Sequence, residues 1–134
     1  MSHIYKAQVE IKDIIPAIMR EAIFLIAKAL NTRISSENII YDYYGNRHTL
    51  NDDWVVLEYN LYNNAKNIAI NIKTGEVRAD FYQNRYLQDR LLKMIKDTYI
   101  GILAMKQIQS QLYTYSSNIN VFENKVEILL EVEV

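Results

Sequence analysis

The chain has 134 residues, of which 50% are hydrophobic and 23% are charged, and its net charge is −1. These proportions are typical of a globular protein, and the length predicts one domain over residues 1–134. The chain contains no cysteine, which excludes disulfides, zinc–thiolate sites, iron–sulfur clusters and thiol nucleophiles.

The first 32 residues predict a strand followed by a helix. Apolar residues alternate with polar ones over 5–11, as in a half-buried strand. Asp13 is expected to cap the helix, and Pro16 falls in its first turn, where a missing N–H costs little. The helical stripe then consists of Ile15, Ile18, Met19, Ala22, Ile23, Ile26, Ala27 and Leu30.

The middle of the chain predicts four strands, over residues 39–44, 54–61, 68–72 and 77–81. Turn residues separate them at Gly45-Asn46, Asn63-Asn64 and Thr74-Gly75. Residues 45–53 show no clear period and are expected to form a loop. One face of the second of these strands carries Val55 and Leu57, and the other face carries Val56.

The last third predicts a second helix over 86–113 and a closing hairpin that turns at residues 123–125. Glutamates at 127, 131 and 133 place charge on the hairpin and guard its edge against stray pairing. The fold class is therefore α+β, in the order β-α-β-β-β-β-α-β-β. We expect an antiparallel sheet with two long amphipathic helices on one face.

Several short segments resemble a family of uncharacterised proteins encoded in cyanobacteria and in algal plastid genomes. These segments are the Met-Ser-His start, Ile11-Lys12-Asp13 before the first helix, Tyr43-Tyr44-Gly45, Ala79-Asp80-Phe81-Tyr82 and Thr98-Tyr99. The resemblance extends over nearly the whole chain and implies the same layout. It implies no activity, because none is established for that family.

The segment 45–53 is the first candidate for a functional region, since long loops carry function more often than short ones. Arg47 suits a carboxylate or phosphate, and Tyr44 and His48 lie beside it. A metal held by His3, His48 and an aspartate is disfavoured, because nothing in the spacing brings the two histidines together. We expect no metal and no cofactor.

A second candidate is the segment that carries Asp80, Tyr82 and Arg85. Asp80 is expected to pair with Arg78 or Arg85, or to line a groove. Glu58 and Asp80 are an imaginable acid–base pair, but no nucleophile with a neighbouring base supports catalysis. The eleven tyrosines suit a protein interface, whereas acidic neighbours such as Asp42 and Asp80 disfavour nucleic acid.

These features favour a small non-enzymatic interaction or accessory protein that acts as a homodimer and binds an unidentified protein partner. The dimer is expected on the uncovered sheet face, which should carry Tyr41 or Tyr44, Val56, Tyr62, Ala69 and Leu129 among polar residues. The alternative is a module that binds a small molecule or nucleic acid through 45–53, and an enzyme is least favoured. No signal-peptide pattern and no long apolar run is evident. We therefore expect a cytoplasmic protein with no membrane partner, and an archaeal or viral AT-rich genome fits the composition.

Overall fold

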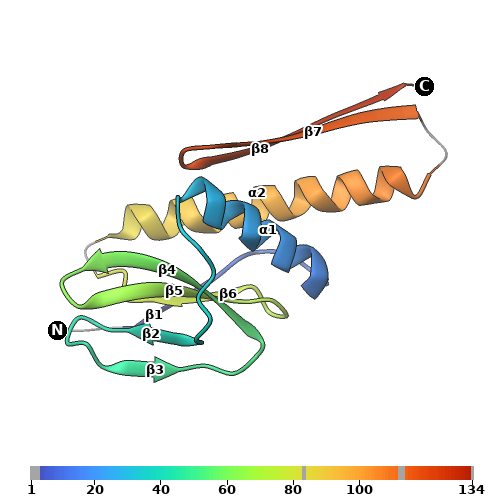
Figure 1. Cartoon of the computed structure of the whole chain (residues 1–134). Coiled ribbons are helices and arrows are strands. Elements are labelled where there is room, and N and C mark those ends of the chain that lie inside the picture. The colour runs from blue at the N-terminus through green and yellow to red at the C-terminus, as the bar shows by residue number, and fades with distance from the viewer. Residues whose placement is uncertain (1–3, 83, 112–113, 134) are drawn as a thin grey trace.

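The computed structural model describes residues 4–82, 84–111 and 114–133 and has an α+β fold (Figure 1). Two helices and eight strands follow the predicted order, with one additional short strand. They are β1 (Tyr5–Gln8), α1 (Pro16–Ala29), β2 (Ile39–Tyr41), β3 (Arg47–Thr49), β4 (Trp54–Tyr62), β5 (Ala65–Asn71), β6 (Glu76–Ala79), α2 (Arg85–Gln109), β7 (Thr114–Phe122) and β8 (Lys125–Glu133).

The main sheet is antiparallel and is organised around β5. Strand β4 pairs along one edge of β5, with Val56 opposite Ala69. The other edge pairs with β2 at Lys66 and with β6 at Ala69 and Ile70. β1 extends the sheet beyond β6, and β3 extends it beyond β2. The turns after β2 and β4 and the segment entering α2 all lie at one end of this sheet (Figure 1, left).

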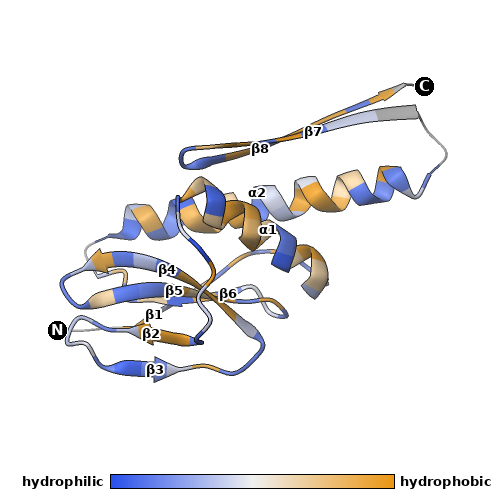
Figure 2. Cartoon of the chain, viewed as in Figure 1, coloured by the Kyte–Doolittle hydropathy of each residue, from blue (hydrophilic) through white to orange (hydrophobic). Residues whose placement is uncertain are grey.

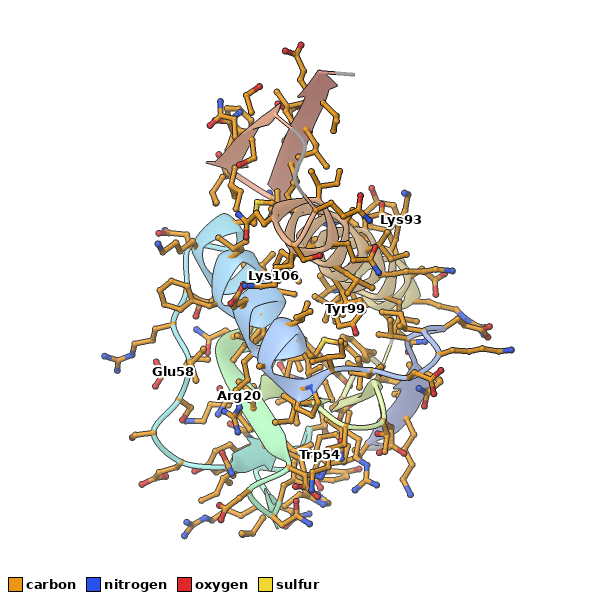
Figure 3. The ribbon with its side chains drawn as sticks, turned by 90° about the vertical axis from the view of Figure 1, so that its right-hand side faces the viewer. Arg20, Trp54, Glu58, Lys93, Tyr99 and Lys106 are labelled. Atoms are coloured by element: carbon orange, nitrogen blue, oxygen red, sulfur yellow. The ribbon has the colours of Figure 1, made fainter. Side chains whose placement is uncertain are left out.

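Both helices cover the same face of the main sheet, as predicted, and they run in opposite directions (Figure 1). Their apolar stripes bury a single large cluster against β4, β5 and β6, and Figure 2 shows orange, hydrophobic residues recurring along both helices. Tyr99 of α2 is fully buried between the helices and the sheet (Figure 3). Its hydroxyl accepts a hydrogen bond of 2.8 Å from the backbone N–H of Ile15.

The start of α1 differs from the prediction. Ile15, not Asp13, is the N-cap residue, and no side chain caps the helix. Asp13 instead has a positive φ of 54°, in the tight connection between β1 and α1. The N–H of Ile15 instead donates to the hydroxyl of Tyr99. Because these two residues are 84 positions apart in sequence, a local pattern could not predict this arrangement.

The opposite face of the sheet is partly covered, which corrects the expected dimer surface. Val56 and Ala69 are completely buried there, together with Ile40 and Trp54. Ile4 and Leu50 pack against the same small cluster. Two of the residues expected to be exposed for self-association are therefore already inside the protein.

The closing hairpin forms a third layer instead of joining the main sheet. β7 and β8 pair only with each other within the described residues, and they lie on the far side of the helices (Figure 1). Ile128 of β8 sits against Gly101 of α2, where an added Cβ would lie 2.7 Å from the Ile128 Cδ1 atom. The N–H of Asn124, in the hairpin turn, donates to the carbonyl of Ala29 at the end of α1 (2.7 Å).

The segment 45–53 is more ordered than a loop, because β3 lies within it and pairs with β2. The second helix ends at Gln109, and its predicted end at residue 113 lies outside the described residues. His3, which was considered as a metal ligand, also lies outside them. None of the described helices combines the length and the apolarity needed to cross a membrane.

Candidate functional site

Four tyrosines gather at the end of the main sheet where its turns meet. We call Tyr43, Tyr44, Tyr62 and Tyr82 the tyrosine cluster. Tyr43 and Tyr44 come from the turn after β2, Tyr62 from the end of β4, and Tyr82 from the segment before α2. The ring of Tyr62 lies 5.2 Å from that of Tyr43 and 6.0 Å from that of Tyr82, measured between centroids. Tyr44 meets Tyr43 edge to face at 5.0 Å.

Asp80 lies at the base of this cluster and is only 1% exposed. Its carboxylate accepts hydrogen bonds from the backbone N–H groups of Tyr43 (2.9 Å) and Tyr82 (3.2 Å). Together with Tyr62 and Tyr82 it lines a cavity of about 210 Å³. Burial and the nearby charge of Asp80 raise the pKa of the Tyr62 phenol. The cluster is thus built around an anion.

The expected ion pair between Asp80 and an arginine is absent from the described residues. Arg78 pairs with Glu76 and lies over the ring of Trp54, 4.6 Å from its centroid. Arg85, the first residue of α2, lines a separate cavity with Phe81. Asp80 therefore has backbone donors but no cationic partner in this part of the chain.

A second buried carboxylate, Asp42, holds the turn that carries Tyr43 and Tyr44. It accepts hydrogen bonds of 3.0 Å from the N–H groups of Tyr44 and Asn46 and from the Nε2 atom of His48. Burial alone would raise the pKa of Asp42, but hydrogen bonds from His48, Asn46 and Tyr44 outweigh it and lower the pKa from 3.8 to about 2. Gly45 completes the turn with a φ of 80°.

The structure thus brings together four of the six predicted site residues. Tyr44 and Tyr82 belong to the cluster, Asp80 lies at its base, and His48 holds Asp42 beside it. Arg47 is exposed on β3 opposite Tyr41 and forms no ion pair with a described residue. Two buried carboxylates near the cluster oppose the binding of an anion by Arg47.

The described residues contain neither a cluster of metal ligands nor the acid–base pair considered from the sequence. No group of three or more His, Asp or Glu side chains among residues 4–82, 84–111 and 114–133 could hold a metal ion. Glu58 and Asp80 line separate cavities, so they do not form the acid–base pair considered from the sequence. His48 is engaged with a structural carboxylate.

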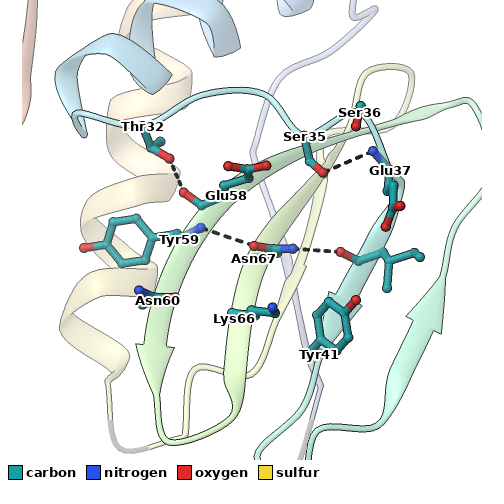
Figure 4. Close-up of a pocket in the computed structure, with 11 residues that line it drawn as sticks. Thr32, Ser35, Ser36, Glu37, Tyr41, Glu58, Tyr59, Asn60, Lys66 and Asn67 are labelled. Carbon is teal, nitrogen blue, oxygen red and sulfur yellow. Dashed lines mark hydrogen bonds between the residues drawn. The ribbon is translucent and has the colours of Figure 1, made fainter.

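A larger polar groove of about 590 Å³ lies between the strands and the connection from α1 to β2 (Figure 4). At its base Asn67 has a φ of 75°, accepts a hydrogen bond from the N–H of Tyr59 (3.3 Å) and donates one to the carbonyl of Ile39 (3.1 Å). The amide therefore joins β4 to β2 across β5, next to the point where the pairing of β4 with β5 shifts register.

Three ionic side chains line this groove: Glu37, which is exposed, and Glu58 and Lys66, which are engaged by their neighbours. Glu58 accepts from Arg33 at 2.6 Å, and the Lys66 ammonium lies 4.6 Å above the ring of Tyr41. The groove can accommodate a small polar molecule by volume. It offers no buried charge without a partner, unlike the cavity at Asp80.

Three residues of the site were not predicted: Asp42, Tyr43 and Tyr62. Tyr62 was expected only on the dimer face and Tyr43 only within the predicted strand 39–44, because their contact depends on which turns share one end of the sheet. Asp42 had a local signal, since an aspartate placed before a Tyr-Gly-Asn turn often accepts hydrogen bonds from the turn's N–H groups.

Comparisons with models of known protein families, with curated proteins and with solved structures find no match to this chain.

Proposed function

We propose that this protein is a small non-enzymatic interaction protein and that the tyrosine cluster is its recognition surface. The observation that supports this function is the gathering of four tyrosines on backbone held by Asp42 and Asp80. Tyrosine is enriched at protein interfaces and at their energetic centres. The cysteine-free composition favours an intracellular site of action.

The geometry suits recognition because the rings are held before a partner arrives. Tyr44 is 60% exposed, whereas its N–H is bound to Asp42. A surface that is ordered in the free protein loses little conformational entropy on binding. Asp42 and Asp80 also favour one class of partner. Their negative potential disfavours nucleic acid and favours a basic protein surface.

The test is differential capture of partners from an extract of the cells that encode the protein. The bait variants are Tyr44→Ala and Tyr82→Ala, and the matched control is Tyr86→Ala, an exposed tyrosine on α2 outside the cluster. Loss of a hot-spot tyrosine costs at least about 1–2 kcal/mol, so we expect roughly tenfold less partner with the cluster variants. Equal capture by all three variants, measured by quantitative mass spectrometry, would refute this function.

We also propose that the protein acts as a homodimer, through a surface different from the one expected from its sequence. β7 is a nine-residue strand without a charged residue. Its partner β8 carries Lys125, Glu127 and Glu131, so only β8 is protected against edge pairing. Ile119 and Val132, which share the helix-facing side of the hairpin with Ile128, remain 37% and 38% exposed. Pairing of β7 with β7 of a second copy would cover both the open edge and part of this apolar surface.

A further inference from the structure

The cavity beside Asp80 has the chemistry of a cation site. Asp80 is 1% exposed, and its carboxylate accepts from two backbone N–H groups. No lysine, arginine or histidine of the described residues pairs with this carboxylate. A carboxylate has about four acceptor positions, so room remains for further donors. Burial of an anion is costly until a positive charge compensates it.

The walls of the cavity add a second attraction for a cation. Tyr62 and Tyr82 line it, and their rings are stacked with an interplanar angle of 30°. Aromatic faces carry negative electrostatic potential and attract ammonium and guanidinium groups. Leu61 and Asn84 also line it, so the described residues place no cationic side chain in the walls.

The size of the cavity limits what can enter it. Its volume of about 210 Å³ lies below the roughly 300 Å³ at which pockets for whole small molecules begin. The space suits one functional group that belongs to a larger partner. A protein side chain meets this condition, because its backbone can remain on the surrounding tyrosine surface.

We propose that this cavity receives the guanidinium group of an arginine from the partner protein, with Asp80 as its counter-ion and Tyr62 and Tyr82 as its aromatic contacts. Arginine is favoured over lysine because its planar group stacks on rings and donates several hydrogen bonds at once. This inference rests on the proposed function, since it names the group by which the partner enters the tyrosine cluster.

The inference is tested with a small probe that needs no knowledge of the partner. Nα-acetyl-arginine methylamide is titrated into the ¹⁵N-labelled protein, and the isosteric but uncharged citrulline derivative is the matched control. We expect saturable shifts at the amides of Tyr43 and Tyr82, which donate to Asp80. We expect no such shifts with citrulline. Equal shifts with both probes would overturn the proposal.

Two sets of variants assign the binding to these groups. Asp80→Asn should abolish saturable binding, whereas Asp52→Asn, which removes an exposed charge from the turn before β4, should not change it. If Asp80→Asn does not fold, Tyr82→Leu decides the question, because it keeps the carboxylate and removes one ring. Several-fold weaker binding by Tyr82→Leu supports the proposal, and unchanged binding contradicts it.

The outcome can be separated from that of the proposed function. Partner capture that is lost in Tyr44→Ala and Tyr82→Ala but retained in Asp80→Asn, with no arginine-specific shift, would refute the cation site alone. Capture that is unaffected by the cluster variants would refute the interaction surface, whatever the probe does.

Discussion

Asp42 shows how one side chain holds the turn that carries two residues of the tyrosine cluster. Its carboxylate binds two N–H groups of the turn and His48 at the same time, and it is almost completely buried. A charged acceptor holds such N–H groups more strongly than a neutral one. The conformation of Tyr43 and Tyr44 therefore depends on Asp42 remaining ionised.

Asp42→Asn should lower the free energy of unfolding at neutral pH by about 1–2 kcal/mol, because charge-assisted hydrogen bonds are lost. The pKa of Asp42 is lowered in the folded protein from 3.8 to about 2. Its contribution is thus complete above the ordinary pKa and is lost as the pH falls through the folded value. Denaturant unfolding from about pH 7 to about pH 2 should show the difference between variant and wild type shrinking only below about pH 4.

The matched control is Asp52→Asn, which removes an exposed carboxylate outside the turn after β2 and should give a small difference at every pH. A constant difference between wild type and Asp42→Asn across this range would show that the lost stability does not come from the charge of Asp42.

Individual side chains also show what a sequence can and cannot predict at this scale. Asp80 and Tyr82 were identified as site residues because polar groups follow a short strand. Tyr62 was not, since it lies 18 positions before Asp80 and meets it only through the turn of β4 into β5. The hydrogen bond of Tyr99 was not predicted for the same reason, because its partner is at the start of α1.

At the scale of elements, Gly101 determines how closely the hairpin approaches α2. A glycine inside a helix normally costs about 1 kcal/mol relative to alanine. Here the absence of a Cβ admits Ile128, whose Cδ1 and Cβ atoms would lie 2.7 Å and 3.2 Å from an added Cβ. The helix therefore carries a weak helix former where the third layer contacts it.

Gly101→Ala should accordingly destabilise the protein, although alanine is the better helix former. Ile128→Val removes the Cδ1 atom, so in its background the cost of Gly101→Ala should fall or reverse. A double-mutant cycle measured by thermal or denaturant unfolding should give a coupling of about 0.5 kcal/mol or more. If Gly101→Ala instead stabilises the wild-type protein, the proposed close contact between Gly101 and Ile128 is refuted. Lys96→Ala, on the exposed side of α2, is the control for the effect of helix propensity on stability.

The regular elements were predictable because their apolar residues repeat with the helical or strand period. α1, α2 and strands β4 to β6 carry long repeats, and the structure confirms them. β3 was missed because Arg47, His48 and Thr49 are all polar and its pairing comes from β2. The separate layer of β7 and β8 was also missed, since nothing local distinguishes a hairpin on the helices from one in the sheet.

At the scale of the whole molecule, burial depends on neighbours that a strand pattern does not contain. Alternation placed Val55 and Val56 on opposite faces, and the structure agrees. It left open whether the second face is covered, and Leu50 and Ile4 pack against part of it. The surface available for self-association therefore moves from the main sheet to the hairpin.

The β7 edge should pair with β7 of a second copy, which gives a four-stranded sheet across the dimer axis. In this dimer, lysines placed at positions 116 and 118 of one copy would lie next to the same lysines on β7 of the second copy. Within one hairpin, Ser116 lies opposite Glu131 and Asn118 lies opposite Leu129. Ser116→Lys with Asn118→Lys should therefore convert the dimer into a monomer without unfolding it, because like charges at a strand edge oppose pairing. Light scattering at high micromolar concentration measures the mass, and Ser36→Lys on an exposed connection should remain dimeric. A wild-type monomer, or a double-lysine variant that stays dimeric, would show that this edge is not the interface.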